Sequence, residues 1–481
     1  MSSHPEASHI ARFRAILGDR GVLTEADRIS PYLTDFRNLY LGSTPAVLRP
    51  GSTAEVSAVM RVCTELKIPV VPHGGNTGYC GGATPRESGQ DVVLSLERLD
   101  RIRAVDPLNY TLTAEAGCIL ARVQEAAANA DRLYPLSLGS EGSCQLGGTL
   151  ATNAGGTAVL RYGNTRDLVL GLEVVLPDGE IVDGLRALRK DNLGYDLKQL
   201  FIGSEGTLGI ITAAVLKLFP RPAAHVTAML ALRDVEAAVE LLSQARQYTG
   251  DMVTTFELLP RIAVDLTTRH IPGVRDFFAA KHEWFALVEF SLASLQLSQR
   301  ELAETFLMGA IEQGLVIDAA LAQSEADRQA MWRMRESIPE AQRHAGASVK
   351  HDISVPLSCV PGFIAEAGAA VRKLVPGVRL VAYGHIGDGN LHFNLSPPAG
   401  GDEQEFLAQA GAVHDAVFAM VSARGGSVAA EHGVGRLKRD ALPRYRAGAE
   451  YELMVRIKRS LDPLGIMNPG KVIQFDDAGS V

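Results

Sequence analysis

The chain has 481 residues, of which 46% are hydrophobic and 21% are charged, a composition typical of a globular protein with two or three domains. A net charge of −8 argues against a nucleic-acid-binding protein, because affinity for the phosphate backbone needs a basic face. The five cysteines are scattered and form no CxxC pair, so neither a disulfide framework nor a cysteine zinc site is predicted.

The N-terminal segment contains no apolar run of signal-peptide length, and no later run approaches the ~18 residues that a membrane span needs. We therefore expect a soluble, unexported protein, and the cysteine usage favours the reducing cytoplasm.

A first glycine-rich loop follows a predicted helix and strand. Ser52 and Glu55 form a capping-box pattern, and apolar residues then recur at helical spacing up to Leu66. Residues 69–72 read as a short strand that leads into residues 73–82, of which five are glycines. Such a loop can bring bare backbone amides close to a ligand.

Two further glycine-rich stretches occur at residues 139–156 and 203–209. Between them, Asp178-Gly179 separates two apolar runs within residues 173–182, which predicts an antiparallel hairpin. Glycine-rich loops gathered in one domain indicate a phosphate-containing cofactor, because clustered amides form anion-binding nests. None of them is a GxGxxG fingerprint framed by strand and helix, so a nicotinamide-binding doubly wound fold is disfavoured.

The texture of the sequence changes after residue 220. Strand-like runs at 226–232, 284–291 and 315–319 alternate with helical runs at 235–248 and 295–313. This pattern predicts a separate α+β layer over an antiparallel sheet. A helix is expected at residues 453–461.

Potential metal ligands gather towards the C-terminus. His385 and His392 flank the turn-forming residues 387–390, and Glu431 could complete a His2Glu set that leaves a coordination position open for a substrate. His432 would then be a free base beside the metal. The residues alone leave a second interpretation open, namely that both histidines are hydrogen-bonded core residues.

Taken together, the motifs resemble the FAD-linked 2-hydroxy-acid dehydrogenases of the vanillyl-alcohol-oxidase type, with the hydroxyglutarate branch the most similar. The resemblance covers residues 40–473 and rests on six segments in this order: 72–78, 147–156, 203–212, 385–392, 431–435 and 468–471. It implies an α+β fold, in which an FAD-binding domain (1–220) of two α+β subdomains is followed by an antiparallel-sheet substrate domain (221–425) and a C-terminal segment (426–481) that returns to the FAD domain.

The resemblance also implies the cofactor and its contacts. The FAD pyrophosphate is expected on the amides of the first loop, and Asn468 near the flavin ring. Covalent attachment in some relatives uses a histidine after the paired glycines, whereas here His73 precedes them and Asn76 follows, so we expect non-covalent FAD. The implied cofactor-binding residues are Pro72, Gly74, Gly75, Asn76, Thr77, Gly78, Ser140, Gly148, Thr149, Thr152, Gly155, Glu205, Ile210 and Asn468.

On the substrate side, the resemblance implies that Arg335 and Lys350 hold a substrate carboxylate and that Asn394 is a polar contact. It implies a divalent metal, with zinc expected, on His385, His392 and Glu431, and His432 as the catalytic base. Pro339 stands where the pattern has a threonine, which leaves the length of the substrate open.

The expected reaction is oxidation of D-2-hydroxyglutarate, with D-malate as a second substrate, to the 2-oxo acid by hydride transfer to FAD. The alternatives are a D-lactate or glycolate dehydrogenase and, in another class, a non-catalytic FAD subunit for electron transfer. We expect a homodimer, and an electron-transfer flavoprotein as a candidate acceptor.

Overall fold

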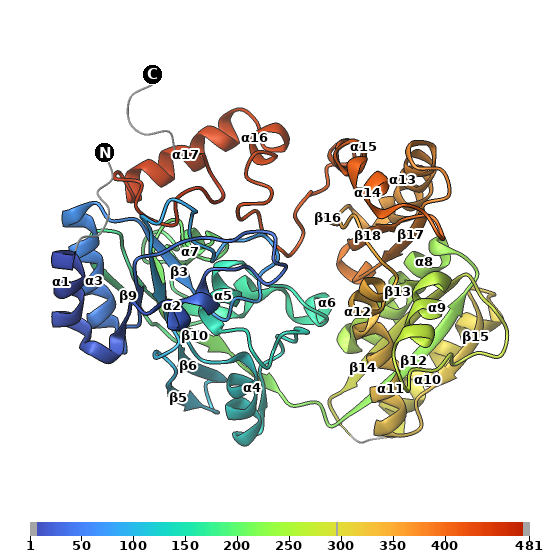
Figure 1. Ribbon diagram of the computed structural model, residues 1–481. Helices are drawn as coiled ribbons and strands as arrows, with labels where there is room; N and C mark the ends of the chain where they lie inside the picture. Colours follow the sequence, from blue (N-terminus) through green and yellow to red (C-terminus); the bar gives the residue numbers. More distant parts are fainter. Residues whose placement is uncertain (1–6, 295–296, 475–481) are drawn as a thin grey trace. The chain divides into compact units, whose positions relative to one another are not determined.

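The computed structural model describes residues 7–294 and 297–474, and the chain divides into two compact units (Figure 1). The first unit takes its described residues from the ranges Met1–Gly155, Asn164–Arg221 and Glu431–Val481. The second unit contains Gly156–Gly163 and Pro222–Ala430. No pattern in the sequence predicted that residues 156–163 group with the second unit.

The first unit contains two main sheets. One has the order β1 (Val22–Leu23), β2 (Val47–Leu48), β4 (Val92–Ser95), β3 (Val70–His73), with the last three strands parallel to one another. The other is antiparallel, in the order β5 (Ile102–Asp106), β6 (Thr111–Glu115), β10 (Ile210–Lys217), β8 (Val169–Val175), β9 (Ile181–Gly184). A short pair joins β7 (Arg132–Leu133) to β11 (Phe219–Pro220). The predicted hairpin is confirmed as β8 and β9.

Helix α3 (Thr53–Leu66) forms as its capping pattern predicts. The Ser52 side chain accepts a hydrogen bond from the Glu55 amide at 3.2 Å, while the Glu55 carboxylate accepts one from the amide of Gly51 at 2.7 Å. The apolar stripe of α3 is buried except for the partly buried Leu66 at its end, and α1 (Ala7–Leu17) lies beside it (Figure 1). The helix ends at Lys67, which adopts a left-handed conformation.

The second unit is built on an antiparallel sheet in the order β13 (Val253–Pro260), β14 (Trp284–Leu292), β12 (Ala224–Leu232), β15 (Val316–Leu321). Alternate residues of β12 enter two different cores, because successive side chains of a strand point to opposite faces. One core includes α8 (Val235–Thr249) and α10 (Leu297–Glu312), and the other includes α9 (Arg261–His270), α11 (Glu325–Glu336) and α12 (Ile338–His344). Strand β13 was not predicted, and residues 295 and 296 of the predicted helix lie outside the described residues.

A second sheet of this unit has the order β16 (Asp352–Ser354), β18 (Asn390–Ser396), β17 (Arg379–Tyr383). Helices α13 (Val360–Leu374) and α15 (Ala410–Ser422) pack on it through the same core as α8. The α+β class and the antiparallel substrate-domain sheet are therefore confirmed. The remaining helices are α2 (Ala26–Ile29), α4 (Leu120–Asn129), α5 (Leu146–Ala151), α6 (Val159–Tyr162), α7 (Lys198–Phe201), α14 (Glu403–Ala408), α16 (Leu442–Tyr445) and α17 (Ala449–Leu461).

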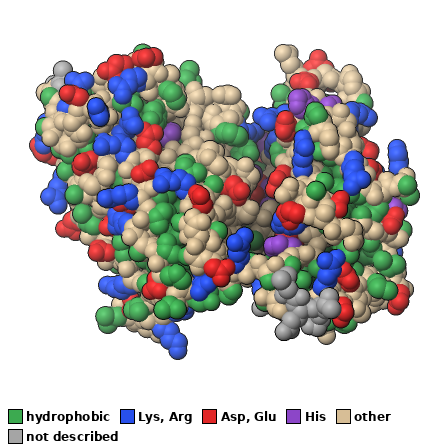
Figure 2. All heavy atoms as spheres, turned by 90° about the horizontal axis from the view of Figure 1, so that it is seen from below, with side chains coloured by type: hydrophobic (Ala, Val, Ile, Leu, Met, Phe, Trp, Pro, Cys, Tyr) green, Lys and Arg blue, Asp and Glu red, His purple; other side chains and the backbone are tan. Residues whose placement is uncertain are grey.

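Acidic and basic side chains alternate on the face shown in Figure 2, in agreement with the modest net charge. Across the described ranges, we find no helix with the length and apolar character to cross a bilayer.

Candidate active site

A tight turn between β17 and β18 carries His385. Gly384 precedes it with φ 148°, and Gly389 closes the turn with φ 78°. A Cβ on Gly389 would lie only 2.1 Å from the carbonyl oxygen of Val355, so the backbone can pass there only as glycine. The glycines of this segment therefore form the predicted turn.

His392 lies in the middle of the three-stranded sheet. It pairs with Asp352 of β16 on one side and with Tyr383 of β17 on the other, so the three side chains share one face. Its neighbours Leu391 and Phe393 point the other way, into the hydrophobic core. The Tyr383 and His392 rings lie 5.0 Å apart between centroids.

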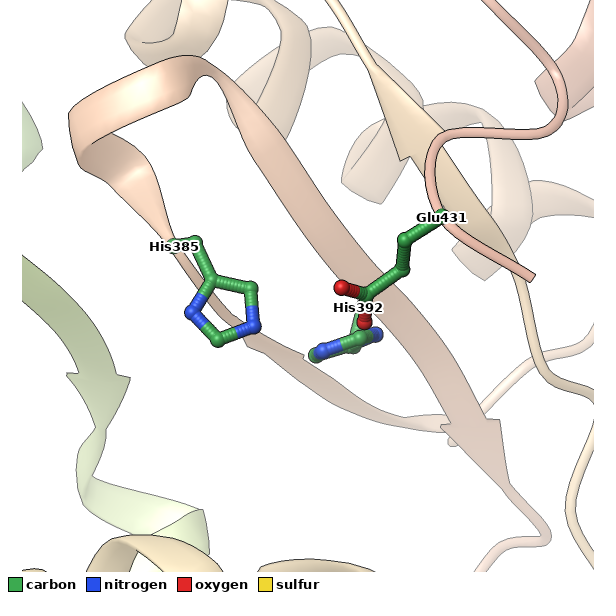
Figure 3. A group of neighbouring side chains, drawn as sticks. All are labelled: His385, His392 and Glu431. Atoms are coloured by element: carbon green, nitrogen blue, oxygen red, sulfur yellow. The ribbon is translucent and has the colours of Figure 1, made fainter. Parts of the chain in front are cut away.

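His385, His392 and Glu431 form a candidate metal centre (Figure 3). One ligand atom from each lies within 4.8 Å of the others. Glu431 directly follows Ala430, whose amide donates a hydrogen bond to the Asp352 carbonyl oxygen at 3.3 Å. Two imidazoles and one carboxylate are a donor set that suits zinc and several other divalent ions.

A second group of potential ligands, Asp352, Glu431 and His432, shares Glu431 with the first. The His432 ring also lies 4.6 Å from the ring of Tyr79. His432, the expected base, is therefore also a potential ligand.

Glu257 joins His385 to Arg335. Its Oε1 accepts a hydrogen bond from His385 Nδ1 at 2.5 Å, and its Oε2 accepts one from Arg335 Nε at 2.6 Å. Burial alone would raise the pKa of Glu257, but the charges of Arg335 and His385 outweigh it and lower the pKa to about 2. The Arg335 guanidinium also lies 4.9 Å from the centroid of the Tyr383 ring.

The other residues predicted to bind substrate lie on neighbouring elements of the second unit. Asn394 is buried, with Oδ1 accepting from the His351 amide at 3.3 Å and Nδ2 donating to Gln342 Oε1 at 3.0 Å. Lys350 directly precedes His351 and is partly exposed. Pro339 lies in the first turn of α12 and provides no side-chain donor.

The three glycine-rich stretches come together in the first unit. A Cβ on Gly75 of the first would lie 2.2 Å from the Ser143 carbonyl oxygen of the second. A Cβ on Gly206 of the third would lie 3.0 Å from Pro72. The side chain of Asn468 donates to the carbonyl oxygens of Gly82 and Glu205 at 3.0 and 2.8 Å, which adds the C-terminal segment to the same place.

Two protein-family models match this chain. Residues 221–472 match the model described as FAD linked oxidases, C-terminal domain, and residues 44–184 match an FAD binding domain. The chain belongs to the FAD-linked oxidase family. Its flavin cofactor and its vanillyl-alcohol-oxidase type of fold are thereby confirmed.

Named relatives of this FAD-linked oxidase span almost the whole chain. A probable mitochondrial D-2-hydroxyglutarate dehydrogenase from Oryza sativa subsp. indica is 39% identical over 466 residues, covering 96% of this chain and 81% of its own length. A D-2-hydroxyglutarate dehydrogenase from Xanthomonas citri pv. viticola is 37% identical over 455 residues, covering 95% and 94%. A D-2-hydroxyglutarate–pyruvate transhydrogenase from Saccharomyces cerevisiae is 33% identical over 478 residues, covering 97% and 95%.

Solved structures show the same fold at low identity. A p-cresol methylhydroxylase structure with substrate bound aligns with a TM-score of 0.78 at 18% identity over 98% of both chains. An alkyldihydroxyacetonephosphate synthase structure aligns with a TM-score of 0.72 at 17% identity over 98% of this chain and 86% of the other.

The residues of this FAD-linked oxidase fit a flavin nucleotide. Among the described residues, the buried Oδ1 of Asn468 and the buried Oε1 of Gln145 have no hydrogen-bond partner. Unpaired buried acceptors of this kind are uncommon in folded proteins, and a ligand with amide and hydroxyl donors would satisfy them. Gly78 and Gly148 have no described atom within 4 Å of a Cβ position, so their backbone is open on that side.

Other predicted cofactor residues form hydrogen bonds or packing contacts within the protein. The hydroxyls of Thr149 and Thr152 donate to the carbonyl oxygens of Leu146 and Gly148, which leaves their lone pairs available. Asn76 adopts φ 52° and donates to the Thr34 carbonyl oxygen. The Ile210 side chain lies in the hydrophobic core. The remaining positions, Gly74, Thr77, Ser140 and Gly155, are partly exposed in or beside the first two glycine-rich stretches.

Sequence reasoning missed Glu257 and Gln145. Glu257 is an acidic residue inside the apolar strand β13, and a carboxylate in such a run has to be paired. That pattern could have drawn attention to the strand. Gln145 directly precedes α5, within the second glycine-rich stretch, and its type alone gives no comparable indication.

Proposed function

We propose that this protein oxidises D-2-hydroxyglutarate to the 2-oxo acid, with D-malate as a second substrate. The names of relatives at 33–39% identity over at least 94% of the chain support this substrate. The observation that carries the proposal is the trio His385, His392 and Glu431 within 4.8 Å in an FAD-linked oxidase, because an open metal centre suits an alcohol flanked by a carboxylate.

The two bound groups supply different chemistry. FAD, when bound, supplies an acceptor for the hydride that leaves C2 of the substrate. A divalent metal, when bound, supplies positive charge that lowers the pKa of an alcohol beside it. His385 and His392 would hold that ion through one ring nitrogen each, and Glu431 through a carboxylate oxygen.

The protein's own side chains would orient the substrate and move one proton. His432 accepts the proton of the 2-hydroxyl, a general-base role that an imidazole can fill. Arg335 and Lys350 pair with the distal carboxylate. Arg335 also donates through Nε to Glu257, which holds its guanidinium in place.

The proposal includes how FAD is attached and which metal is bound. We propose that FAD is held without a covalent bond, because His73 precedes the paired glycines. Acid denaturation should then release all of the yellow colour into the supernatant. Zinc is the proposed metal, and elemental analysis of the purified protein tests its identity. The homodimer and the cytoplasmic location remain predictions.

Anaerobic mixing of the flavin-loaded protein with single acids tests the function. D-2-hydroxyglutarate should bleach the visible flavin absorbance rapidly, D-malate more slowly, and D-lactate and glycolate least. If D-lactate or glycolate bleached the flavin fast and the two dicarboxylates did not, the protein would be a monocarboxylate dehydrogenase instead. No bleaching by any of the four acids would favour the electron-transfer subunit.

The acceptor can be tested in the same experiment. We propose an electron-transfer flavoprotein, and the printed name of the yeast relative makes pyruvate the specific rival. After substrate has reduced the flavin, each acceptor is added separately. Rapid return of the flavin colour with pyruvate, together with formation of lactate, would identify pyruvate as the acceptor in place of the electron-transfer flavoprotein.

A further inference from the structure

One buried carboxylate of the second unit contacts two residues to which the proposed function gives different tasks. Glu257 accepts hydrogen bonds from His385, a proposed metal ligand, and from Arg335, a proposed cation for the distal carboxylate. The donor–acceptor distances are 2.5 and 2.6 Å, in the range of charge-assisted bonds. Glu257 itself has no exposed surface.

The bond to Glu257 determines how His385 can bind a metal. An imidazole that donates Nδ1–H to a carboxylate is fixed in one tautomer and leaves Nε2 as the ligand atom. A carboxylate in this position also makes the ring a stronger ligand.

The same carboxylate restricts Arg335. Its Nε is held by Glu257, and its guanidinium lies over the ring of Tyr383 at 4.9 Å. Arg335 is only 7% exposed, so the rest of the side chain is also confined. The guanidinium is therefore held in one orientation, which lowers the entropy lost when a substrate carboxylate binds.

Backbone hydrogen bonds keep His385 in register with Glu257. Leu258 donates its amide to the Gly384 carbonyl oxygen at 2.9 Å, and Gly384 donates back to Leu258 at 3.1 Å. These bonds connect the residue after Glu257 to the residue before His385. A shift of β13 would thus move the histidine and the carboxylate together.

We propose that Glu257 is a positioning residue that orients His385 for the metal and Arg335 for the distal carboxylate at the same time. The inference rests on the proposed function, because that function assigns the two tasks. It explains why a strand that is otherwise buried and mostly apolar contains a glutamate. It also predicts that one substitution weakens two separable properties.

Glu257→Gln tests the proposal. A glutamine has one acceptor oxygen, so its amide nitrogen must face either the His385 Nδ1–H or the Arg335 Nε–H, and one bond is lost. We expect the affinity of the protein for Zn²⁺, measured by competition with a chelator, to fall by ~10–100-fold. We also expect the KM for D-2-hydroxyglutarate to rise more than the KM for D-lactate. Glu257→Asp, which keeps the charge, should restore part of both.

Glu289→Gln is the matched control. Glu289 is a buried carboxylate of the neighbouring strand β14 that pairs with Arg328 and Trp332. Its substitution should disturb the same sheet to a similar extent and leave Zn²⁺ affinity and the KM ratio unchanged. The thermal midpoints of both metal-free variants report on folding independently of activity.

The outcomes separate this inference from the proposed function. Unchanged Zn²⁺ affinity in a folded Glu257→Gln protein, or an equal loss in Glu289→Gln, overturns the positioning role. If Glu257→Gln fails to fold, Glu257→Asp decides: its side chain is one methylene shorter and should keep only part of the two hydrogen bonds, so undiminished Zn²⁺ affinity and an unchanged KM ratio would overturn the role. A wild-type protein that binds no divalent ion and is not reduced by any 2-hydroxy acid refutes the proposed function itself.

Discussion

The carboxylate of Glu205 holds the backbone of Gly435, although 230 positions separate the two residues. Oε2 accepts the Gly435 amide at 2.8 Å, and Oε1 accepts the Val434 amide at 2.7 Å. The Glu205 carbonyl oxygen accepts from Asn468 as well. The third glycine-rich stretch and the C-terminal segment are therefore joined by one side chain and its own backbone.

Glu205→Gln should weaken this connection. The amide nitrogen of glutamine would face one of the two backbone N–H groups, and that group would lose its partner. We expect the free energy of unfolding to fall by ~1–3 kcal/mol and FAD to dissociate more readily. Urea titration and flavin retention on gel filtration measure the two effects, with exposed Glu180→Gln as the control. Equal retention of FAD in both variants would contradict the prediction.

Local patterns in the sequence predicted local structure correctly. Ser52 and Glu55 placed the start of α3, and the glycines around His385 placed the turn, because both effects act within a few residues. Glu257 could not be assigned in this way. Its partners are 78 and 128 positions away, and only the pairing of β13 with β14 and the contact with Gly384 bring them together.

Asn394 and Ile210 have contacts within the protein that the motifs did not predict. The ligand contacts that the resemblance implies for both residues stay predictions, and the structure adds protein partners for the Asn394 amide and a core position for Ile210. A motif transfers residue types, but it does not say which atoms the protein itself uses.

Because of Lys471, we expect the stability of the FAD-free protein to increase with pH in the alkaline range. Among the described residues the buried Nζ of Lys471 has no hydrogen-bond partner. Burial lowers the pKa of Lys471 to about 8, although the charge of Asp91 acts to raise it. The unfolded chain binds this proton up to ~pH 10.4, so the free energy of unfolding should rise between about pH 8 and that value.

Lys471→Met should remove this rise and stabilise the FAD-free protein by up to about 3 kcal/mol at neutral pH. Urea unfolding at about pH 7 and about pH 10 measures it, with exposed Lys190→Met as the control. A variant that is less stable than wild type at neutral pH would show that Lys471 has an anionic partner in the apoprotein.

Asp462→Ala should destabilise the C-terminal segment strongly. Lys458 Nζ donates to Asp462 Oδ2, Thr207 O and Met467 O at 2.5, 2.7 and 2.9 Å, and both charged groups are buried. Removing the carboxylate leaves an uncompensated buried charge, which costs about 3–5 kcal/mol. The double variant Lys458→Met/Asp462→Ala should recover part of this loss in urea titrations. A single variant as stable as wild type would contradict the role.

Lys350→Ala should discriminate between dicarboxylate and monocarboxylate substrates. If Lys350 pairs with the distal carboxylate, the KM for D-2-hydroxyglutarate should rise by ~10-fold or more with kcat nearly unchanged, because uniform binding is lost. The KM for D-lactate, which has no distal carboxylate, should stay the same. Full efficiency of the variant on D-2-hydroxyglutarate would remove Lys350 from the substrate site.

His432→Ala decides between the two roles that the geometry leaves to this residue. A base lost from the reaction lowers kcat by ~10²-fold or more while metal affinity and flavin content stay normal. A lost ligand instead weakens Zn²⁺ binding, as His392→Ala should. Chelator competition and anaerobic flavin reduction on both variants, with the exposed His344→Ala as control, distinguish the cases. His432 acts as the base only if its variant keeps the metal that the His392 variant loses, and near-normal turnover would exclude both roles.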